Sequence, residues 1–404
     1  MATPLRLLTY STLFPSNERP HHGVFVENRL RHLVASGQAA STVVAPVPWF
    51  PSQSPMFGDW SRNARVTARE IRHGLVVHHP RYLVIPRVGM TLAPSLLFRA
   101  SLPVIRRLLA DGATIDAIDA HYVYPDGVAA VWIGRALGLP VVVTARGTDV
   151  NLLPRYAVPR RLIQGAIAGA AALVAVSSAL KDALVALGAP PDKVTVLRNG
   201  VDTGLFRPPA DRETVRRSLG LTRPTLLSVG WLIERKGHHR AIEALPSLPG
   251  TDLLIVGEGP ERDRLARLAA QRGVSDRVRL LGASPHEALP ALYGAADALV
   301  LASSREGWAN VLLESMACGT PVVASPIWGN PEVVQSRDAG LIAESNTPEG
   351  IADAVRRLFA DPPARDATRA YAERFGWEET TAGQIALFRR VVAEAPLRLA
   401  GGGR

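Results

Sequence analysis

The sequence is poor in several residue types that build common structural or binding sites. Cys318 is the only cysteine among 404 residues, which excludes a disulfide scaffold and a cysteine-based zinc or iron–sulfur centre. Lysine is almost as scarce, since Lys181, Lys193 and Lys236 stand beside 43 arginines. Aromatic residues make up only 6% of the chain, but hydrophobic residues make up 47%, so global disorder is excluded.

Long hydrophobic runs are also missing. Leu33–Gly58 and Leu162–Leu180 lack charged residues, but prolines interrupt the first, and the second is mostly Ala, Gly and Ser. The first is therefore expected to form a strand followed by a loop, and the second is too weakly apolar for a spanning helix. Met1–Tyr10 carries Arg6 inside a short apolar run, which indicates a first strand rather than a signal peptide. We expect a cytoplasmic protein that is either soluble or peripheral at the inner face of the cell membrane.

Acidic residues are in deficit, and the deficit is confined to one half of the chain. The net charge is +10, of which residues 1–205 carry +9 and residues 206–404 carry +1. Nucleic acid, an anionic membrane surface or an anionic substrate would each suit a basic half. The arginines are scattered, with no basic helix and no aromatic platform, so nucleic acid is the weakest choice. An anionic acceptor or membrane surface is favoured.

Short apolar runs alternate with helical patterns along the whole chain, which predicts an α/β fold with parallel sheets. The helical patterns are Val24–Ala35, Gly127–Leu137, Ala179–Leu187, Glu261–Gln271 and Asn310–Met316. The expected strands are Leu5–Thr9, Thr42–Ala45, Ile115–Ile118, Val141–Thr144, Leu173–Val176, Val194–Val196, Thr225–Val229, Asp252–Val256, Val278–Leu281, Ala298–Leu301 and Val322–Ala324.

So many strands would make an implausibly wide single sheet, so two doubly wound, Rossmann-like domains are predicted, with the ligand at a central cleft. Turn residues cluster at Asn199–Pro209, which places the boundary near 203/204. Residues 1–203 form the N-terminal domain, and a helix at about 377–396 is expected to pack back on it. Residues 204–376 form the C-terminal domain, and 397–404 form a disordered tail.

Two glycine-bearing loops follow predicted strands and precede helices. In Ser228–Gly237, Arg235 and Lys236 lie where a helix N-terminus would add positive potential, which suits an anion such as phosphate. Gly257–Pro260 lacks the third glycine of a dinucleotide fingerprint. Taken alone, each loop also fits an ordinary β–α turn.

Two glutamates mark the segment that carries most chemistry. Glu306 lies in the polar loop after the strand that ends near Ala302, and Glu314 lies on the following helix, from about Ala309 to Ala317. A carboxylate between Leu313 and Met316 is costly unless it is paired or accepts hydrogen bonds, and ribose hydroxyls would be suitable donors. A salt bridge inside a domain core is the alternative, and the pair alone leaves it open.

With its E-x7-E spacing, this segment closely resembles the retaining glycosyltransferases of family 4, which have the GT-B architecture. The resemblance covers nearly the whole chain, and seven segments occur in the family's order. They are Leu13–Glu27, Asp119–Gly127, Arg198–Pro208, Lys236–Gly237, Gly257–Pro260, Glu306–Glu314 and Gly329–Val334.

The resemblance implies a role for each matching position. Lys236 would hold the pyrophosphate of a nucleoside-diphosphate sugar with help from Arg235, Glu314 would bond the ribose, and Glu306 would stand beside the transferred sugar. Gly23 would let the N-terminal loop approach the phosphates. The backbone of five residues would contact sugar hydroxyls and phosphate: Gly307, Trp308, Ala309, Asn310 and Val311.

Two positions depart from the family pattern. Trp231 stands where many relatives have arginine, and Arg146 stands where many have histidine. An arginine cannot act as a base, but it can stabilise a departing diphosphate, so Arg146 stays a candidate catalytic residue beside Glu306 and Lys236. A structural partnership with Asp149 is the alternative. His121 and Asp149 are candidate contacts for the acceptor or the sugar, although a structural histidine is favoured at 121.

The expected activity is transfer of a sugar from a nucleoside diphosphate to a saccharide or lipid-linked acceptor with retention, in exopolysaccharide, capsule or other cell-surface polysaccharide synthesis. No cofactor is expected. No metal site is expected either, because adjacent histidines such as His21 and His22 point apart and lack paired carboxylates. The alternatives are a GT-B sugar-nucleotide epimerase, a phosphorylase, and a catalytically degenerate nucleotide-sugar-binding or scaffold subunit.

Overall fold

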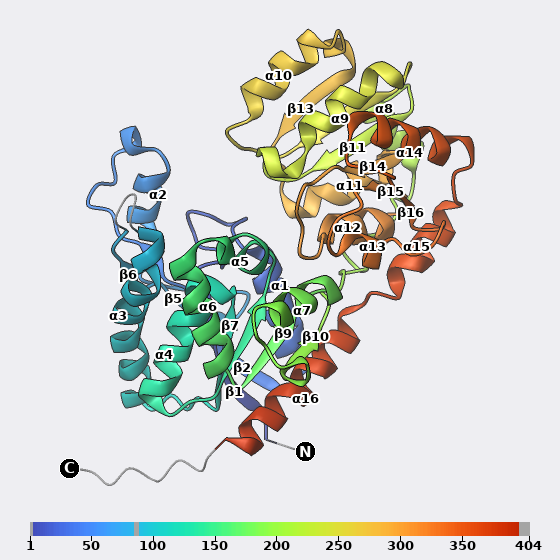
Figure 1. Cartoon of the computed structure of the whole chain (residues 1–404). Helices are drawn as coiled ribbons and strands as arrows, with labels where there is room; N and C mark the ends of the chain where they lie inside the picture. The colour runs from blue at the N-terminus through green and yellow to red at the C-terminus, as the bar shows by residue number, and fades with distance from the viewer. Residues whose placement is uncertain (1–2, 85–88, 396–404) are drawn as a thin grey trace, which may run out of the picture. The chain divides into compact units, whose positions relative to one another are not determined.

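In the computed structural model, residues 3–84 and 89–395 are described, and they divide into two compact units (Figure 1). Unit 1 comprises Met1–Arg198 and Glu378–Arg404, and unit 2 comprises Asn199–Trp377. The breaks differ from the expected 203/204 and 376/377 because Val201 N donates to Phe375 O at 2.9 Å, which ties both crossing segments into unit 2. The tail expected to be disordered, 397–404, lies outside the described residues.

Unit 1 is built on a sheet with strand order β10-β9-β8-β7-β1-β2-β5-β4, in which only β4 and β5 pair antiparallel. The small β3–β6 pair stands apart from this sheet. The strands are β1 (Leu5–Tyr10), β2 (Ala39–Val44), β3 (Val47–Pro48), β4 (Arg69–Arg72), β5 (Leu75–His78), β6 (Arg81–Tyr82), β7 (Ala117–His121), β8 (Val141–Ala145), β9 (Ala172–Ala175) and β10 (Val194–Val196).

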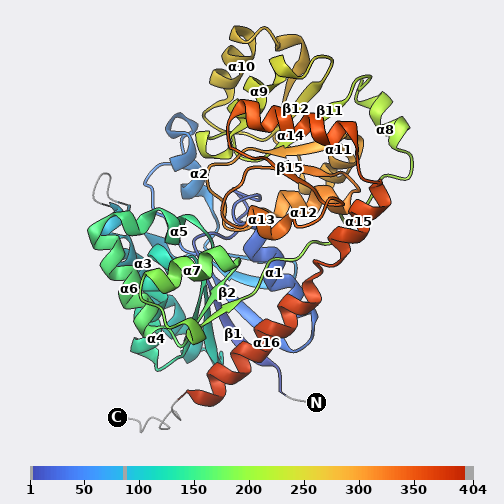
Figure 2. The same cartoon turned by 45° about the vertical axis from the view of Figure 1, so that its right-hand side comes forward.

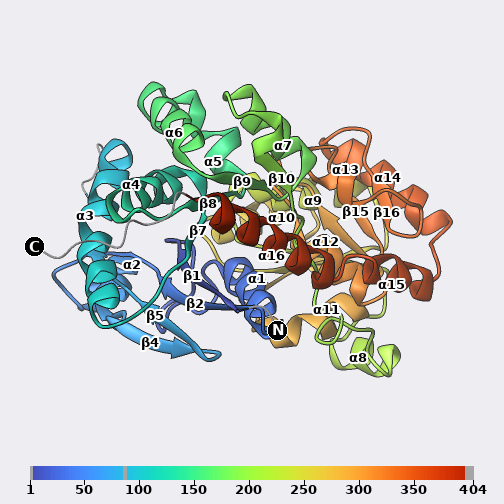
Figure 3. The ribbon, with the colours of Figure 1, turned by 90° about the horizontal axis from the view of Figure 1, so that it is seen from below.

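Helices cover both faces of the unit 1 sheet. The α1 helix (Val24–Ala35) and α16 (Trp377–Glu394) lie side by side (Figure 3), and Leu30 and Phe388 share one core with β1 and β2. The other helices of the unit are α2 (Asp59–Arg65), α3 (Gly89–Ala110), α4 (Val128–Leu137), α5 (Thr148–Asn151), α6 (Ala157–Gly169) and α7 (Ser178–Ala186).

Unit 2 holds a parallel sheet with strand order β13-β12-β11-β14-β15-β16. The strands are β11 (Thr225–Val229), β12 (Asp252–Val256), β13 (Val278–Gly282), β14 (Ala298–Leu301), β15 (Val322–Ala324) and β16 (Gly340–Ile342). One core joins the sheet to α9 (His238–Ala244), α10 (Arg262–Gln271) and α14 (Pro348–Ala360) (Figure 2). The remaining helices are α8 (Arg212–Ser218), α11 (Leu289–Ala295), α12 (Asn310–Ala317), α13 (Asn330–Val333) and α15 (Arg365–Glu373).

All eleven strands expected from the sequence are present, with shifts of a few residues at some ends. The sequence did not predict the antiparallel hairpin that β4 and β5 form across His73 and Gly74. The α3 helix was missed because Pro94 and Pro103 lie inside it, and such residues normally signal a helix boundary.

Candidate active site

The strand order of unit 2 reverses between β11 and β14, and ligands of doubly wound sheets bind at the carboxyl ends of strands at such a point. The loop after β11 brings Lys236 to this position, and the loop after β14 brings Glu306. Lys236 Nζ donates to Glu306 Oε1 at 2.7 Å, although 70 residues separate them. The two residues predicted from separate sequence segments therefore form one site.

Glu306 is a buried carboxylate with cationic and hydroxyl partners. Burial raises its pKa, but Lys236, Arg235 and the Ser303 hydroxyl outweigh burial and lower the pKa below its usual value. Ser303 Oγ donates to Oε1 at 2.8 Å, and Arg235 lies 4.0 Å from Oε2. Glu306 therefore remains a carboxylate at neutral pH. Ser303 was not predicted as a site residue, because its contact with Glu306 arises only from the loop conformation.

The loop that carries Lys236 is held in place by backbone contacts. Gly237 has φ +73°, and a Cβ there would lie 2.0 Å from Ala302 O, so only glycine fits. Ser304 N donates to Arg235 O at 2.8 Å, which joins this loop to the one that carries Glu306. Trp231, which was identified from the sequence as a departure from the family pattern, is 52% exposed.

The loop Gly257–Pro260 supports the Lys236 loop. Leu232 N donates to Glu258 O at 2.6 Å, and Glu261 N donates to Leu232 O at 3.0 Å. A Cβ on Gly257 would lie 1.9 Å from Gly230 O, so the glycine permits close loop packing. The described contacts of this segment are structural.

After Glu306 the chain is anchored by Trp308 and Asn310. Trp308 Nε1 donates to Asn199 O at 3.0 Å, and Asn199 Nδ2 donates to Asn310 Oδ1 at 3.2 Å. Ala309 is the N-cap of α12 and offers no side-chain cap to its first amides. The backbone from Gly307 to Val311, expected to meet sugar and phosphate, thus leads into a helix N-terminus with positive potential.

Glu314 lies on α12 with polar partners that the sequence did not reveal. Tyr293 Oη donates to Glu314 Oε2 at 2.8 Å, and His286 Nε2 lies 3.7 Å from Oε1. The nearby Glu314 carboxylate raises the pKa of His286, because it favours the charged ring. Both partners come from α11 and the turn before it, and neither belongs to a motif with a recognisable spacing.

In unit 1 the strand order reverses between β7 and β1. Asp119 and His121, at the carboxyl end of β7, lie together with Arg146, which directly follows β8. Arg146 Nη2 bonds His121 Nδ1 at 2.7 Å, and His121 Nε2 lies 3.2 Å from Asp119 Oδ2. Burial lowers the pKa of His121 to about 4, so the ring is neutral, donates to Asp119 and accepts from Arg146. Burial also lowers the pKa of Arg146 to about 9, which leaves it cationic at neutral pH.

Asp149 and Gly23 have structural contacts that account for their residue types. The Asp149 carboxylate is buried and accepts the amides of Val123, Arg146 and Gly147 at 2.7–3.2 Å. Arg146 is thus a partner of Asp149 through its main chain, while its side chain meets His121. Gly23 has φ +74°, and a Cβ there would lie 2.3 Å from Leu13 O.

Asp126 is a further buried carboxylate on this edge. It accepts one hydrogen bond from the Thr12 amide and another, at 3.1 Å, from the Thr12 hydroxyl. These bonds join the loop after β1 to the segment after β7. Burial raises the pKa of Asp126 to about 7. The residue lies inside the family-like segment Asp119–Gly127, but only the tertiary contact with Thr12 shows its environment.

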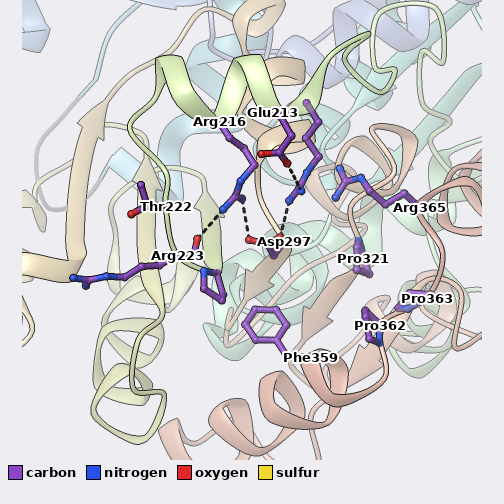
Figure 4. Close-up of a pocket in the computed structure, with 12 residues that line it drawn as sticks. Glu213, Arg216, Thr222, Arg223, Asp297, Pro321, Phe359, Pro362, Pro363 and Arg365 are labelled. Carbon is purple, nitrogen blue, oxygen red and sulfur yellow. Dashed lines mark hydrogen bonds and ion pairs between the residues drawn. The ribbon is translucent and has the colours of Figure 1, made fainter.

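A cavity of about 590 Å³ in unit 2 lies at the opposite, amino-terminal ends of the strands (Figure 4). Asp297 lies between Arg212 and Arg216 at 2.6 and 3.0 Å and also accepts the amide of Thr225. The guanidinium groups of Arg212, Arg216 and Arg365 donate to the carbonyl groups that end α11. These contacts make the cavity wall a structural cluster that closes the helix end.

Two kinds of feature are absent from the described part of the chain. Residues 3–84 and 89–395 hold no group of three or more His, Cys, Asp or Glu side chains placed to bind a metal ion. No helix described there combines the length and apolarity that crossing a membrane requires.

Comparison with known proteins divides the chain near the boundary between unit 1 and unit 2. Residues 23–205 match the family described as Glycosyltransferase Family 4, and residues 211–375 match Glycosyl transferases group 1. The D-inositol 3-phosphate glycosyltransferase of Frankia alni is 31% identical over 81% of this chain and 88% of its own length. D-inositol 3-phosphate glycosyltransferase 1 of Catenulispora acidiphila is 33% identical, over 69% of this chain and 72% of its own length.

Solved structures share the fold. Sucrose-phosphate synthase from Thermosynechococcus elongatus superposes with a TM-score of 0.78 at 21% identity, covering 97% of this chain and 100% of that one. Anabaena HepE, solved in complex with UDP and glucose, superposes with a TM-score of 0.73 at 19% identity, covering 96% of this chain and 100% of that one. The prediction of a GT-B architecture with two doubly wound units is confirmed.

Proposed function

The chain belongs to glycosyltransferase family 4, and on that basis we propose that it transfers a sugar from a nucleoside-diphosphate donor with retention at the anomeric carbon and without a metal. The acceptor is a saccharide or a lipid-linked saccharide. The observation that carries the proposal is the contact between Lys236 and Glu306 at the strand-order reversal of unit 2. It unites a cation for the leaving group with a buried carboxylate for the sugar.

The donor's diphosphate is assigned to Lys236 and Arg235. A lysine ammonium has three donors, and Glu306 takes one of those of Lys236, so two remain for phosphate oxygens. Glu314, oriented by Tyr293, would accept from the ribose hydroxyls. HepE, which shares this fold, was solved with UDP bound, and this supports a nucleotide donor for the present chain.

In the proposed reaction the bond between the anomeric carbon and the diphosphate oxygen breaks, and the bond to the acceptor oxygen forms on the same face. The acceptor hydroxyl proton passes to the departing diphosphate. Glu306 suits electrostatic stabilisation of the positive anomeric carbon better than covalent attack, because Lys236, Arg235 and Ser303 lower the pKa of its carboxylate and with it the nucleophilicity. Lys236 and Arg235 would stabilise the charge that develops on the leaving group.

The acceptor is assigned to unit 1, with Arg146 on the edge that would meet it and Gly23 in the N-terminal loop. His121 holds the Arg146 side chain there, and Asp149 holds its main chain. Unit 1 carries 25 basic and 14 acidic residues, whereas unit 2 carries 21 and 22. The resulting net charge of +11 on unit 1 supports an anionic acceptor or a membrane surface, as in cell-surface polysaccharide synthesis at the inner face of the membrane. The names of the D-inositol 3-phosphate relatives support a phosphorylated polyol as a second acceptor class.

The test is a screen of nucleotide sugars for donor hydrolysis and for transfer, with the anomeric configuration of the product read by NMR. Transfer with retention that survives EDTA and is lost in Glu306→Gln and Lys236→Ala is expected. Arg356→Ala, on the exposed face of α14, is the matched control and should be fully active. Conversion of the donor to an epimer would establish the epimerase alternative. Tight donor binding without turnover would establish a scaffold.

A further inference from the structure

We propose that unit 1 attaches to an anionic membrane by inserting an exposed apolar patch, made of Trp49, Met56, Phe57, Trp60 and Leu83. These side chains are 41–82% exposed, and Met56 is the most exposed. Met90 and Leu92, at the start of α3, are each 42% exposed. Large apolar groups seldom gather on the surface of a soluble protein unless the surface binds something.

The patch stands on an ordered support. Trp49 N donates to Tyr82 O at 2.7 Å, which continues the β3–β6 pairing and brings Trp49 beside the segment that holds Leu83. The Phe50 ring packs 5.3 Å from Phe57 and 5.8 Å from Trp60, measured between ring centroids.

The α2 helix is joined to the same support. The Arg81 guanidinium on β6 donates to the carbonyl groups of Asn63 and Val66 at the end of α2. The apolar side chains are therefore held at the surface by the fold.

The part of the sequence that contains the patch is basic, which suits an anionic surface. Residues 49–107 contain nine arginines but only two acidic residues, Asp59 and Glu70. Arg65 pairs with Glu18 at 2.9 Å and Arg72 pairs with Glu27 at 2.8 Å, so some of this charge is fixed internally. The net charge of +11 on unit 1 still favours phospholipid headgroups, and unit 2, at −1, offers no such attraction.

A membrane fits the patch better than a saccharide does. Methionine and leucine cannot hydrogen-bond sugar hydroxyls, whereas tryptophan beside arginine is the composition of side chains that lie in the headgroup region. Within the described residues, unit 2 exposes only Trp231 and Leu281 among large apolar side chains, so the apolar surface is concentrated in unit 1. The inference rests on the proposed function in one respect: a lipid-linked acceptor would lie in the same membrane.

The test is sedimentation of the full chain with vesicles of phosphatidylcholine alone or of phosphatidylcholine with phosphatidylglycerol. Wild type should bind the anionic vesicles, and Met56→Glu should weaken binding at least tenfold because it places a carboxylate in the acyl boundary. Trp231→Ser, which removes an apolar side chain that is 52% exposed in unit 2, should bind as wild type does. Circular dichroism checks that the variants are folded.

Failure of wild type to bind, or equal binding by Met56→Glu, would overturn the inference. Binding of Met56→Glu equal to wild type at low salt, with both lost at high salt, would show electrostatic adsorption without insertion and would also overturn it. Donor hydrolysis in detergent-free buffer is measured in parallel, since it tests the proposed function without a membrane. Donor hydrolysis without vesicle binding would support the proposed enzymatic activity and contradict the proposed attachment to a membrane.

Discussion

Lys236 and Glu306 lie 2.7 Å apart, nitrogen to oxygen, at the ends of β11 and β14. The charge state of Glu306 and the position of the Lys236 ammonium depend on each other. The ammonium lowers the pKa of the buried carboxylate, and the carboxylate fixes the position of the ammonium. Arg235 lies within 4.0 Å of the same carboxylate, so the site carries an excess of positive charge. Such a site is suited to a negatively charged leaving group.

Lys236→Ala should lower the rate of donor-dependent transfer by about 10²- to 10³-fold, because it removes a preorganised cation from the leaving group. Glu306→Gln should reduce the rate to a similar extent. The double variant should lose less than the product of the two single losses, because the two residues act as one unit. Initial rates at saturating donor measure this, and strictly multiplicative losses would contradict it.

Tyr293→Phe should weaken donor binding and leave turnover largely unchanged. The phenol orients Glu314 through a 2.8 Å hydrogen bond, whose loss costs about 1 kcal/mol and raises KM for the donor about fivefold. Tyr371→Phe is the matched control, since that hydroxyl bonds Val333 O and does not contact Glu314. An unchanged KM for the donor in Tyr293→Phe would contradict the assignment of Glu314 to the donor site.

Gly237→Ala should damage the Lys236 loop beyond the cost of backbone strain. Gly237 and Gly250 have φ of +73° and +71°, but a Cβ at 237 meets Ala302 O at 2.0 Å, whereas one at 250 meets nothing within 4 Å. Gly250→Ala should cost about 1 kcal/mol of unfolding free energy, and Gly237→Ala more, with loss of transfer. Urea denaturation and rate measurements test this, and equal effects of both variants would refute it.

Asp297→Ala should destabilise unit 2, because it leaves Arg212 and Arg216 and the amide of Thr225 without a common acceptor. These groups are partly buried, so a loss of about 2 kcal/mol is expected. Asp353→Ala removes exposed pairs with Arg356 and Arg357 and should cost less than about 0.5 kcal/mol. Chemical denaturation compares the two, and equal stabilities would show that the arginine cluster contributes nothing.

Unfolding free energy should depend on pH through Asp126. Burial raises its folded-state pKa from 3.8 to about 7, so between these values the native state holds a proton that the unfolded chain releases. Stability from this group is therefore lost as pH rises toward 7. Wild type should lose about 2 kcal/mol relative to Asp126→Asn between pH 5 and pH 8. Parallel pH curves for the two proteins would show that Asp126 is already ionised.

Local patterns could predict much of the fold. The apolar strands and intervening helices indicated two doubly wound units, and Val24–Ala35 was predicted with both ends correct. The β4–β5 hairpin was not predicted, because Arg69–Arg72 alternates charged and apolar residues in too short a run to distinguish a strand from a loop. The unit boundary was also displaced, since it depends on Val201 pairing with Phe375, a contact that no local pattern contains.

The sequence by itself determined the family, the two-unit fold and the placement of Lys236 and Glu306 in loops that follow strands, because these follow from local periodicity and motif order. The tertiary structure decided what each side chain meets. It brought Lys236 to Glu306 and Tyr293 to Glu314, and it placed His121 between Asp119 and Arg146 as a neutral ring. Hydrogen bonds and burial depend on groups that are distant along the chain, so charge states and partners emerge only when the sheets are assembled.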